Sequence, residues 1–364
     1  MPSYPTDTQP GIGGAAFEIL AHMPDPTLVI TKRRSGTPVT PPDHVRLVRI
    51  PYWEMTLGAH KGISRFLRLG AKFLGYLMFG LLSFPYMITF RPNIVHIHTP
   101  MPIFHGLFGK YGLRTRLYIS FHGSDASVVA RSLVLRFLVR RAHVICIVSE
   151  AMRSIIEPFA PRPRVFYTPN GVDTEAFPYG VNHRQSVICM VGSLRWQKDY
   201  PTAIHAFHRF RRQFSDWELI IVGEGPDRDR LIALTADLHL QSAVHFKGMQ
   251  SREEVAALMR SSKLFLLSSV SEGFPKVVLE ATSSGTPIVV TDVGSCREIA
   301  ELSGGQIVSP NQPIEMAEAL AAVAKDKVVW QNASEKGRSA ARCYQWATTA
   351  QSLREHYRAS LASE

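Results

Sequence analysis

The feature that most constrains the fold is a regular alternation of short apolar runs with amphipathic stretches along all 364 residues. The runs are continuous in Val, Ile and Leu, which is typical of parallel strands buried on both faces. We predict strands at Leu28–Thr31, Val45–Ile50, Ile94–His98, Leu117–Phe121, His143–Val148, Arg164–Tyr167, Ser186–Val191, Glu218–Val222, Val244–Lys247, Leu264–Leu267, Pro287–Thr291 and Gly305–Val308. Helical patterns lie between them, as at Pro201–Arg212, Asp227–Leu238, Arg252–Ser261, Pro275–Ser284 and Pro313–Lys325. An α/β fold with two parallel sheets, each covered by helices, is expected.

The length favours two domains. The stretch from Pro169-Asn170-Gly171 to Pro178 is the best linker candidate, because proline and glycine interrupt both helix and sheet. We therefore place the first domain at residues 1–178 and the second at 179–345. Ligands of parallel sheets bind beyond the carboxyl ends of the strands, so a site in a cleft between two facing sheets is expected.

The charge is uneven. The chain carries 41 Lys and Arg against 30 Asp and Glu, a net charge of +11. Residues 1–178 hold 20 basic and 10 acidic residues, while the remainder holds 21 and 20. No acidic residue lies between Glu54 and Asp125. This favours a phosphate-bearing or anionic-surface partner for the first half. Nucleic acid is not expected, because no helix-turn-helix pattern or aromatic RNA motif is present.

Residues 61–90 form a separate feature. A basic amphipathic start from Lys61 to Lys72 runs into Phe73–Phe90, which contains no charge. Eighteen residues are the lower limit for a membrane span, and Gly75, Gly80, Ser83 and Pro85 interrupt the run. Three interpretations stay open: a spanning helix, a partly buried helix of the first domain, and a helix on an anionic membrane surface.

The four cysteines (Cys146, Cys189, Cys296, Cys343) are widely spaced, which predicts buried, reduced thiols in a cytoplasmic protein. The first fourteen residues are polar and rich in Pro and Gly, so we expect no secretory signal there. No metal-ligand spacing is present. His96 and His98 are expected to be structural and to face opposite sides of their strand.

The strongest local motif is the loop-to-helix stretch from Glu272 to Glu280. Pro275 suits the first helical turn, and the free N–H groups after Gly273 suit a phosphate, with Lys276 as an added cation. Glu272 would then stand near the reacting end of a ligand, and Glu280 could reach a pair of hydroxyls such as a ribose. The alternative is a surface helix with solvated carboxylates.

A second motif is the apolar strand that ends at Gly192 and is followed by Arg195 and Lys198. Cations at a strand's carboxyl end suit a diphosphate leaving group, although a solvated loop is the alternative. His122 ends another apolar strand and could donate to a phosphate or sugar oxygen, or be structural. The glycine loop at Gly13 and Gly14 is a weak signal for close approach to a ligand.

In this order, the motifs resemble those of the family-4 retaining glycosyltransferases, which have the GT-B fold. The matching residues are Gly13-Gly14, His122-Gly123, Val148-Ser149-Glu150, Pro169–Asp173, Gly192…Lys198, Gly223–Pro226, Phe246–Gly248, Glu272…Glu280 and Asp292…Glu298.

The resemblance implies two Rossmann-like domains, with a nucleotide-diphosphate sugar held by the second and no metal or other cofactor. Glu272 and His122 would be the catalytic residues beside the transferred sugar, Lys198 would bind the diphosphate and Glu280 the ribose. The implied donor site takes in Gly13, Gly14, Ser193, Arg195, Lys198, Gly248, Gly273, Phe274, Pro275, Lys276, Val277 and Glu280. The last helix, within residues 346–364, would return to the first domain.

Three departures from the family pattern stand out. Ser193 occupies the place of a basic residue, which Arg195 could replace in space. Asn93 replaces an Asp, with an expected effect on a turn alone. The family begins with an apolar strand before the glycine loop, whereas Met1–Gly14 here contains none. Either the start codon is assigned too late, which we favour, or the first sheet lacks a central strand.

The resemblance thus implies transfer of a sugar to a saccharide or lipid-linked saccharide, in cell-surface polysaccharide or glycolipid synthesis. We expect a cytoplasmic protein and leave open peripheral attachment to the cytoplasmic face of a membrane. Other GT-B activities, a sugar-nucleotide epimerase or a hydrolase, and an inactive scaffold remain alternatives.

Overall fold

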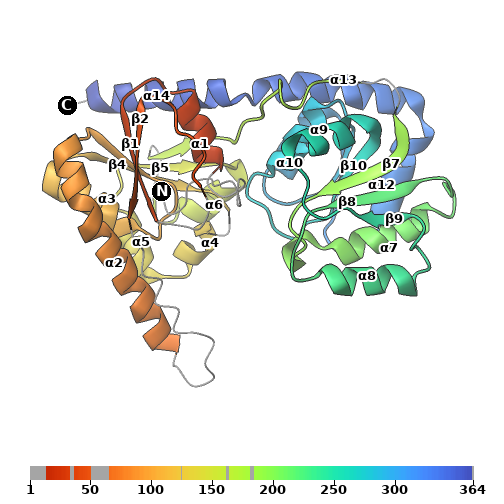
Figure 1. Cartoon of the computed structure of the whole chain (residues 1–364), viewed down its shortest axis with the longest axis horizontal. Helices are drawn as coiled ribbons and strands as arrows, with labels where there is room; N and C mark the ends of the chain where they lie inside the picture. The colour runs from red at the N-terminus through yellow and green to blue at the C-terminus, as the bar shows by residue number, and fades with distance from the viewer. Residues whose placement is uncertain are drawn as a thin grey trace. The chain divides into compact units, whose positions relative to one another are not determined.

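The computed structural model describes residues 14–32, 37–50, 65–123, 125–160, 164–180 and 184–362. The chain divides into two compact units (Figure 1). The first unit comprises Met1–Pro169 together with Thr349–Glu364, and the second comprises Asn170–Thr348. The division after Pro169 falls at the start of the stretch rich in proline and glycine.

The second unit contains a six-stranded, wholly parallel sheet in the order β12-β11-β10-β7-β8-β9. Its strands are β7 Gln185–Val191, β8 Glu218–Val222, β9 Val244–Phe246, β10 Ser262–Leu267, β11 Ile288–Thr291 and β12 Gln306–Val308. All lie where the apolar runs predict strands. The central strands β7 and β10 are buried along most of their length, as expected of strands covered on both faces.

Helices cover both faces of this sheet (Figure 1): α7 packs against α8 and α12 on one face, and α9, α10 and α11 pack against strands on the other, with α13 outside α10 and α11. Asp199 caps α7, and Ser251 with Glu254 forms a capping box at α9. The bounds are η2 Trp196–Lys198, α7 Tyr200–Phe210, α8 Arg228–Asp237, α9 Arg252–Ser261, α10 Lys276–Ser283, α11 Cys296–Ser303, α12 Pro313–Lys325 and α13 Lys327–Cys343.

The first unit contains two separate parallel sheets among its described residues. One has the order β3-β4-β5-β6, and the other pairs β1 with β2. The strands are β1 Thr27–Lys32, β2 Val45–Ile50, β3 Ile94–Ile97, β4 Arg116–Phe121, β5 Val144–Ile147 and β6 Val165–Tyr167. The helices between Gly14 and Ile156 are α1 Gly14–Ala21, α2 Arg65–Phe90, α3 Ile103–Leu113, α4 Asp125–Ala130, α5 Leu133–Val139, η1 Glu150–Met152 and α6 Arg153–Ile156.

The last helix, α14 Trp346–Ala362, begins in the second unit and continues into the first. Its later residues pack on the four-stranded sheet: the ring of Tyr357 meets that of Tyr118 edge-on at 4.9 Å, and His356 stacks on Phe166 at 4.1 Å. Arg354 also forms an ion pair with Asp25, with nitrogen-to-oxygen distances of 2.5 and 3.0 Å. These contacts attach the end of the chain to the first unit.

The helix α2 runs without a break through the residues that were expected to interrupt it, including Pro85. Small side chains explain its packing: a Cβ on Gly80 would lie 2.8 Å from the ring of Phe108 on α3, and Ser83 Oγ lies 2.5 Å from His105 Nδ1. Within the described chain, Phe73–Phe90 is the one helical stretch whose length and apolar composition would suffice for a membrane span, and 22% of it is buried.

The cysteines follow the prediction at three of four positions. Cys146, Cys189 and Cys296 are buried and free, and burial raises the pKa of Cys146 and of Cys189 to about 12. Cys343 is also free but exposed, so its expected burial is wrong. It is the last residue of α13, on the polar side of an amphipathic helix.

Candidate active site

The candidate site lies at the carboxyl ends of β7 and β10, neighbouring strands at the centre of the second sheet. The chain proceeds outward from β7 to β8 and β9, then returns to the other side of β7 for β10 to β12. The strand order therefore reverses between β7 and β10. Loops that leave such a reversal diverge to opposite faces and leave a crevice, where open parallel sheets bind their ligands.

Lys198 and Glu272 meet at this reversal. Lys198 belongs to the turn η2 after β7, and Glu272 lies in the loop between β10 and α10. Lys198 Nζ donates to Glu272 Oε1 at 2.5 Å, and the side chains are 20% and 12% exposed. Ser269 Oγ donates to the same oxygen at 2.6 Å. A carboxylate and an ammonium group are thus held side by side and largely shielded from water.

Glycines allow the neighbouring loops to approach each other closely. Gly223 follows β8 with a φ of +134°, and a Cβ there would lie 2.0 Å from the carbonyl oxygen of Gly192 after β7. Gly223 N–H donates to the carbonyl of Gly248 after β9, at 2.8 Å. Gly294, after β11, has a φ of +56° and a Cβ there would lie 2.5 Å from the Gly273 carbonyl oxygen. Backbone rather than side chains therefore lines this edge.

The start of α10 is held by backbone contacts. Asn170 Nδ2 donates to the carbonyl of Phe274 at 3.1 Å, and Ser295 N–H donates to that of Gly273, also at 3.1 Å. Pro275 was expected in the first helical turn, but its extended backbone (φ −78°, ψ 99°) places it one residue before the helix. The first helical bond runs from Val278 N–H to the Pro275 carbonyl. The N–H groups of Lys276 and Val277 precede that bond and can accept an anion.

The Glu272 carboxylate shifts the pKa values of two neighbouring side chains. Tyr200 donates its hydroxyl to the Gly192 carbonyl at 2.9 Å, and burial together with the nearby Glu272 carboxylate raises the pKa of Tyr200. Burial and the same carboxylate raise the pKa of the Cys296 thiol. Sequence reasoning missed Ser269 and Tyr200. The signal for Ser269 is a polar pair, Ser268-Ser269, directly after a buried strand.

The other predicted donor-site residues are distributed as follows. Ser193 and Arg195 are exposed in the turn after β7, and Glu280 is half-buried on α10. Gly14 is the first residue of α1 in the first unit, whereas Gly13 lies outside the described residues. Within the second unit, the structure therefore brings together Lys198, the glycines of β7 to β9, Glu272 and the start of α10.

His122, the second predicted catalytic residue, lies at the carboxyl end of β4 in the first unit. Its ring stacks on that of His98 at 5.6 Å, and His98 stacks on His96 at 4.5 Å. The expectation that His96 and His98 face opposite sides is wrong, because residues two apart in an extended chain share a face. Burial, with the charge of His122 as a second cause, lowers the pKa of His96 to about 3. Among the residues that the structure describes, no group of three or more His, Cys, Asp or Glu side chains could hold a metal ion.

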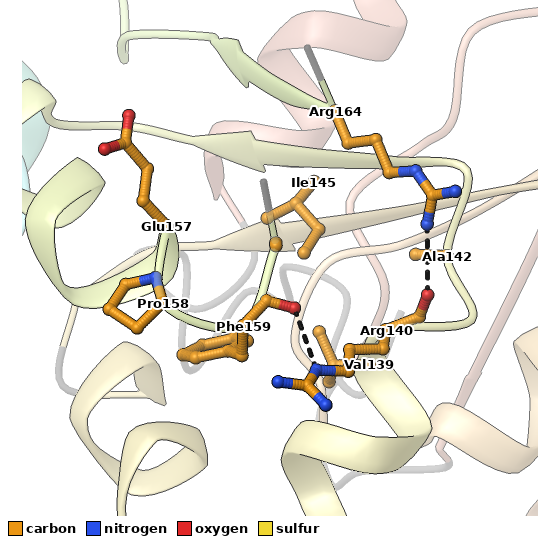
Figure 2. Close-up of a pocket in the computed structure, with 9 residues that line it drawn as sticks. Val139, Arg140, Ala142, Ile145, Glu157, Pro158, Phe159 and Arg164 are labelled. Atoms are coloured by element: carbon orange, nitrogen blue, oxygen red, sulfur yellow. Dashed lines mark hydrogen bonds between the residues drawn. The ribbon is translucent and has the colours of Figure 1, made fainter. Parts of the chain in front are cut away.

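A pocket of about 450 Å³ in the first unit lies away from these residues (Figure 2). Arg140 Nε donates to the Phe159 carbonyl at 3.3 Å beside it, and Arg164 donates to the Arg140 carbonyl at 3.4 Å (Figure 2). Its lining includes Ala142 and Ile145, at the start of β5. It therefore opens at the amino-terminal edge of the sheet, opposite the edge that carries His122.

Two family models together match residues 27–342 of the chain. Residues 27–176 match the family model described as "Glycosyltransferase Family 4", and residues 172–342 match "Glycosyl transferases group 1". N-acetyl-alpha-D-glucosaminyl L-malate synthase of Bacillus anthracis is 25% identical over 267 residues, 68% of this chain and 69% of that protein. Glycogen synthase of Mycobacterium tuberculosis is 26% identical over 294 residues, 76% of this chain and 71% of that protein.

Solved structures resemble this chain over nearly all of its length. Sucrose-phosphate synthase from Thermosynechococcus elongatus superimposes with a TM-score of 0.78 at 17% identity, over 96% of this chain and 92% of its own. Anabaena Alr3699/HepE, in complex with UDP and glucose, has a TM-score of 0.74 at 17% identity, over 97% and 96%. These likenesses extend across both units of the chain.

Proposed function

The chain belongs to glycosyltransferase family 4 and has the GT-B fold, and on this premise we propose that it transfers a sugar from a nucleotide-diphosphate sugar to a saccharide or lipid-linked saccharide. The observation that carries the proposal is the Lys198–Glu272 pair at the strand-order reversal of the second sheet. A donor of this class carries a diphosphate and a sugar, which match an ammonium group and a carboxylate side by side.

In this proposal the donor lies along the carboxyl edge of the second sheet. Lys198 and the N–H groups at the start of α10 bind the diphosphate, with Arg195 close by in sequence. Glu272 binds the sugar, and Glu280, further along α10, binds the ribose. The nucleotide and glucose bound in the similar Anabaena protein support the same ligand class here.

We propose that the acceptor oxygen attacks the anomeric carbon from the same face that the diphosphate leaves, which retains the anomeric configuration. The bond from the anomeric carbon to the phosphate oxygen breaks, the acceptor oxygen bonds to that carbon, and the acceptor proton passes to the departing diphosphate. A carboxylate that is bonded to both Lys198 and Ser269 is a weak nucleophile, which supports this route over a covalent intermediate on Glu272. Glu272 instead stabilises positive charge that develops on the sugar. We assign His122, at the carboxyl end of β4, to contact with the transferred sugar.

We also propose that transfer needs neither a metal ion nor another cofactor. The leaving diphosphate gains negative charge as the bond breaks, and the second unit supplies positive charge from Lys198, Arg195 and the backbone N–H groups at α10. Lys198 Nζ has three N–H donors, so it can bind a diphosphate oxygen while it still donates to Glu272. Cations and oriented dipoles of this kind stabilise a departing phosphate in water-excluded sites.

The acceptor is proposed to be presented at a membrane. One side of α2 carries Phe79 and Met87, which are buried, while apolar side chains that are exposed lie along the rest of the helix: Phe73, Leu74, Met78, Leu81, Leu82, Tyr86 and Ile88. The acid-free stretch 55–124 surrounds this helix in sequence. Exposed apolar side chains beside excess positive charge suit the cytoplasmic face of an anionic membrane.

A donor screen tests the function. The purified chain is incubated with uridine, guanosine and adenosine diphosphate sugars and with saccharide and lipid-linked acceptors, with and without EDTA. We expect one donor to yield a glycosylated product of retained configuration by NMR, unaffected by EDTA. A sugar released as free monosaccharide, or an epimerised donor in the absence of acceptor, would instead establish a hydrolase or an epimerase.

Liposome sedimentation tests the membrane proposal separately. We expect the protein to sediment with phosphatidylglycerol vesicles at low salt and not with phosphatidylcholine vesicles. The double variant Leu74→Ser/Leu81→Ser should lose binding. The matched variant Val328→Ser, at an exposed position of α13, should retain it. Equal sedimentation of all three proteins would contradict the assignment to α2.

A further inference from the structure

The amino-terminal edge of the four-stranded sheet in the first unit carries a row of arginines. β3 to β6 are parallel, so all four strands begin at this edge. One arginine stands shortly ahead of each strand in the sequence: Arg91 before β3, Arg114 before β4, Arg141 before β5 and Arg164 before β6. We call these four residues the arginine row. Neighbouring strands lie about 4.8 Å apart, so the row spans about 15 Å in the order β3-β4-β5-β6.

The positive charge of the arginine row is not balanced by carboxylates. Among the residues that the structure describes, no member of the row takes part in an ion pair. Arg141 and Arg164 donate instead to backbone carbonyls, those of Phe137 at 2.6 Å and of Arg140 at 3.4 Å. A row of unpaired cations attracts an anionic partner.

The cavity of about 450 Å³ in Figure 2 lies at this edge, and Arg140 and Arg164 supply its basic groups. Both side chains are exposed. Each guanidinium has five N–H donors, and only one of them is used within the described residues. Glu157 also lines the cavity, but its carboxylate points away from both guanidinium groups (Figure 2). Forked donors of this kind match the oxygens of a phosphate group.

Lys110, near the end of α3, adds a further cation beside the row. Its Nζ donates to the Arg141 carbonyl at 2.6 Å. Burial, together with the nearby charges of Arg164 and Arg141, lowers the pKa of Lys110. The cations are therefore close enough to repel one another. An anion that binds between them would relieve this repulsion.

Exposed apolar side chains lie on three helices that end beside the row. Arg91 directly follows α2, Arg114 follows α3, and Arg140 and Arg141 follow α5. The exposed apolar side chains near these ends are Tyr86 and Ile88 of α2, Tyr111 of α3, and Leu133, Val134 and Phe137 of α5. The Arg141 guanidinium lies over the Phe137 ring, 3.6 Å from its centre. Apolar groups beside cations suit an anionic membrane surface, whereas a soluble polyanion such as nucleic acid offers no apolar phase to receive them.

We propose that the amino-terminal edge of the first unit binds the phosphate groups of anionic membrane lipids, with one head group in the cavity between Arg140 and Arg164. The exposed apolar side chains of α2, α3 and α5 then enter the lipid interface beside these phosphates. This inference extends the proposed membrane contact of α2 and rests on it. The binding edge is distinct from the candidate active site, because it lies opposite the edge that carries His122.

The test compares two pairs of substitutions with the same loss of charge. Arg140→Gln/Arg164→Gln removes both cavity arginines, and Arg212→Gln/Arg230→Gln, at exposed positions of the second unit, is the matched control. Binding is measured by sedimentation with vesicles of phosphatidylglycerol and phosphatidylcholine in equal amounts. We expect the cavity pair to weaken binding about 30-fold, because each cation near an anionic membrane contributes about a factor of five. The control should bind like the wild type.

A second pair keeps the test valid if the cavity pair fails to fold. Arg91→Gln/Arg114→Gln changes two exposed members of the row outside the cavity. We expect the same loss of about 30-fold, with an unchanged circular dichroism spectrum and unfolding temperature. Wild-type binding by the folded arginine variants, or equal weakening by the control pair, would overturn the proposal.

Two further ligands distinguish the source of the phosphate. Millimolar glycerol phosphate should not displace the protein from vesicles. Displacement would show that the cavity takes a soluble phosphate compound and would overturn the membrane assignment. Binding of a single-stranded RNA in place of vesicles would likewise overturn it in favour of a nucleic-acid surface.

Sugar transfer to a soluble saccharide, measured on the same proteins, separates this inference from the proposed function. Both arginine pairs should transfer at the wild-type rate. Transfer by a wild-type protein that binds no vesicles would overturn the inference alone, and vesicle binding without transfer would overturn the transferase alone. Loss of binding in Leu74→Ser/Leu81→Ser but in neither arginine pair would keep the membrane contact at α2 and overturn the role of the row.

Discussion

At the scale of single residues, the candidate site depends on a few side chains whose positions are tightly constrained. Lys198 and Glu272 are 74 positions apart in the chain, yet their charged atoms are in hydrogen-bond contact. The carboxylate is held by Ser269, and the Lys198 carbonyl accepts from Ser268 at 2.7 Å. Two consecutive serines after β10 thus fix both members of the pair. Both members can therefore be tested by substitution.

Lys198→Met and Glu272→Gln should each lower the rate of sugar transfer about 100-fold or more, because each removes a charge that stabilises the transition state. Each should also lower thermal stability, since its partner is left largely buried and unpaired. The double variant should regain stability and remain inactive. Lys325→Ala and Glu335→Ala, at exposed positions, are the matched controls. Transfer near the wild-type rate in either single variant would contradict the assigned roles.

The glycines at the ends of the strands are testable in the same way. Gly223→Ala should lower the free energy of unfolding by about 3 kcal/mol, because the methyl group would meet the Gly192 carbonyl in a backbone region that only glycine adopts readily. Gly70→Ala is the control. That position lies in α2 with open space around it, so a gain of about 0.5–1 kcal/mol is expected there. Urea unfolding followed by circular dichroism measures both changes.

At the scale of elements, α2 shows how two helices pack through small residues. A Cβ at Gly112 on α3 would lie 2.6 Å from the ring of Phe84, just as one at Gly80 would meet Phe108. Close approach buries the Ser83–His105 hydrogen bond between the helices. Ser83 Oγ donates its proton to the Gly80 carbonyl at 2.8 Å. The hydroxyl oxygen therefore accepts from His105 Nδ1–H, which fixes the orientation of the imidazole. Protonation of His105 would place a charge in this apolar contact.

The stability of this helix pair should therefore depend on pH. Burial lowers the pKa of His105 to about 3, against an ordinary value of 6.5. The unfolded chain binds the proton first, so the stability is full above pH 6.5 and is lost as the pH falls toward 3. Each pH unit in that window costs about 1.4 kcal/mol at this site.

His105→Gln should reduce that slope, whereas His22→Gln, at an exposed position, should leave it unchanged. Hydrogen exchange of α3 peptides at pH 7, 6, 5 and 4 measures the free energy of local opening. An identical slope in His105→Gln and the wild type would contradict the buried, neutral state of this histidine.

At the scale of the whole molecule, charge and chemistry are divided between the two halves of the sequence. Residues 1–178 carry a net charge of +10, while the remainder carries +1 and holds the Lys198–Glu272 pair. A few placed cations would suffice for the diphosphate of the proposed donor, because they act at close range in a largely buried site. The diffuse excess in the first half acts at longer range and is weakened by salt.

This division predicts which unit binds a nucleotide. Binding of a nucleoside diphosphate should slow amide exchange in the second unit, at the loops after β7, β8 and β10 and at the start of α10. Peptides of β3 to β6 should be unaffected by the nucleotide alone. Hydrogen exchange with mass spectrometry measures both regions in one experiment. Protection confined to the first unit would contradict the assignment of the donor site to the second unit.

Sequence reasoning located the strands of both units and the loops that carry the candidate site, because each depends on neighbouring residues. Continuous apolar runs indicate buried strands, and glycine followed by charge marks their carboxyl ends. It failed where an outcome depends on packing against distant residues. Gly75, Gly80 and Pro85 suggested breaks in a helix that α3 holds continuous, and Cys343 was expected to be buried but lies exposed.

The sequence by itself determined the α/β class, the order of elements and the residue types at the carboxyl ends of the strands. These properties follow from local periodicity and from backbone preferences of Gly and Pro. Only the tertiary structure decided that β7 lies beside β10, which brings Lys198 to Glu272. The reason is physical: strand order is set by the burial of whole faces between distant segments, and no local pattern records which strands become neighbours.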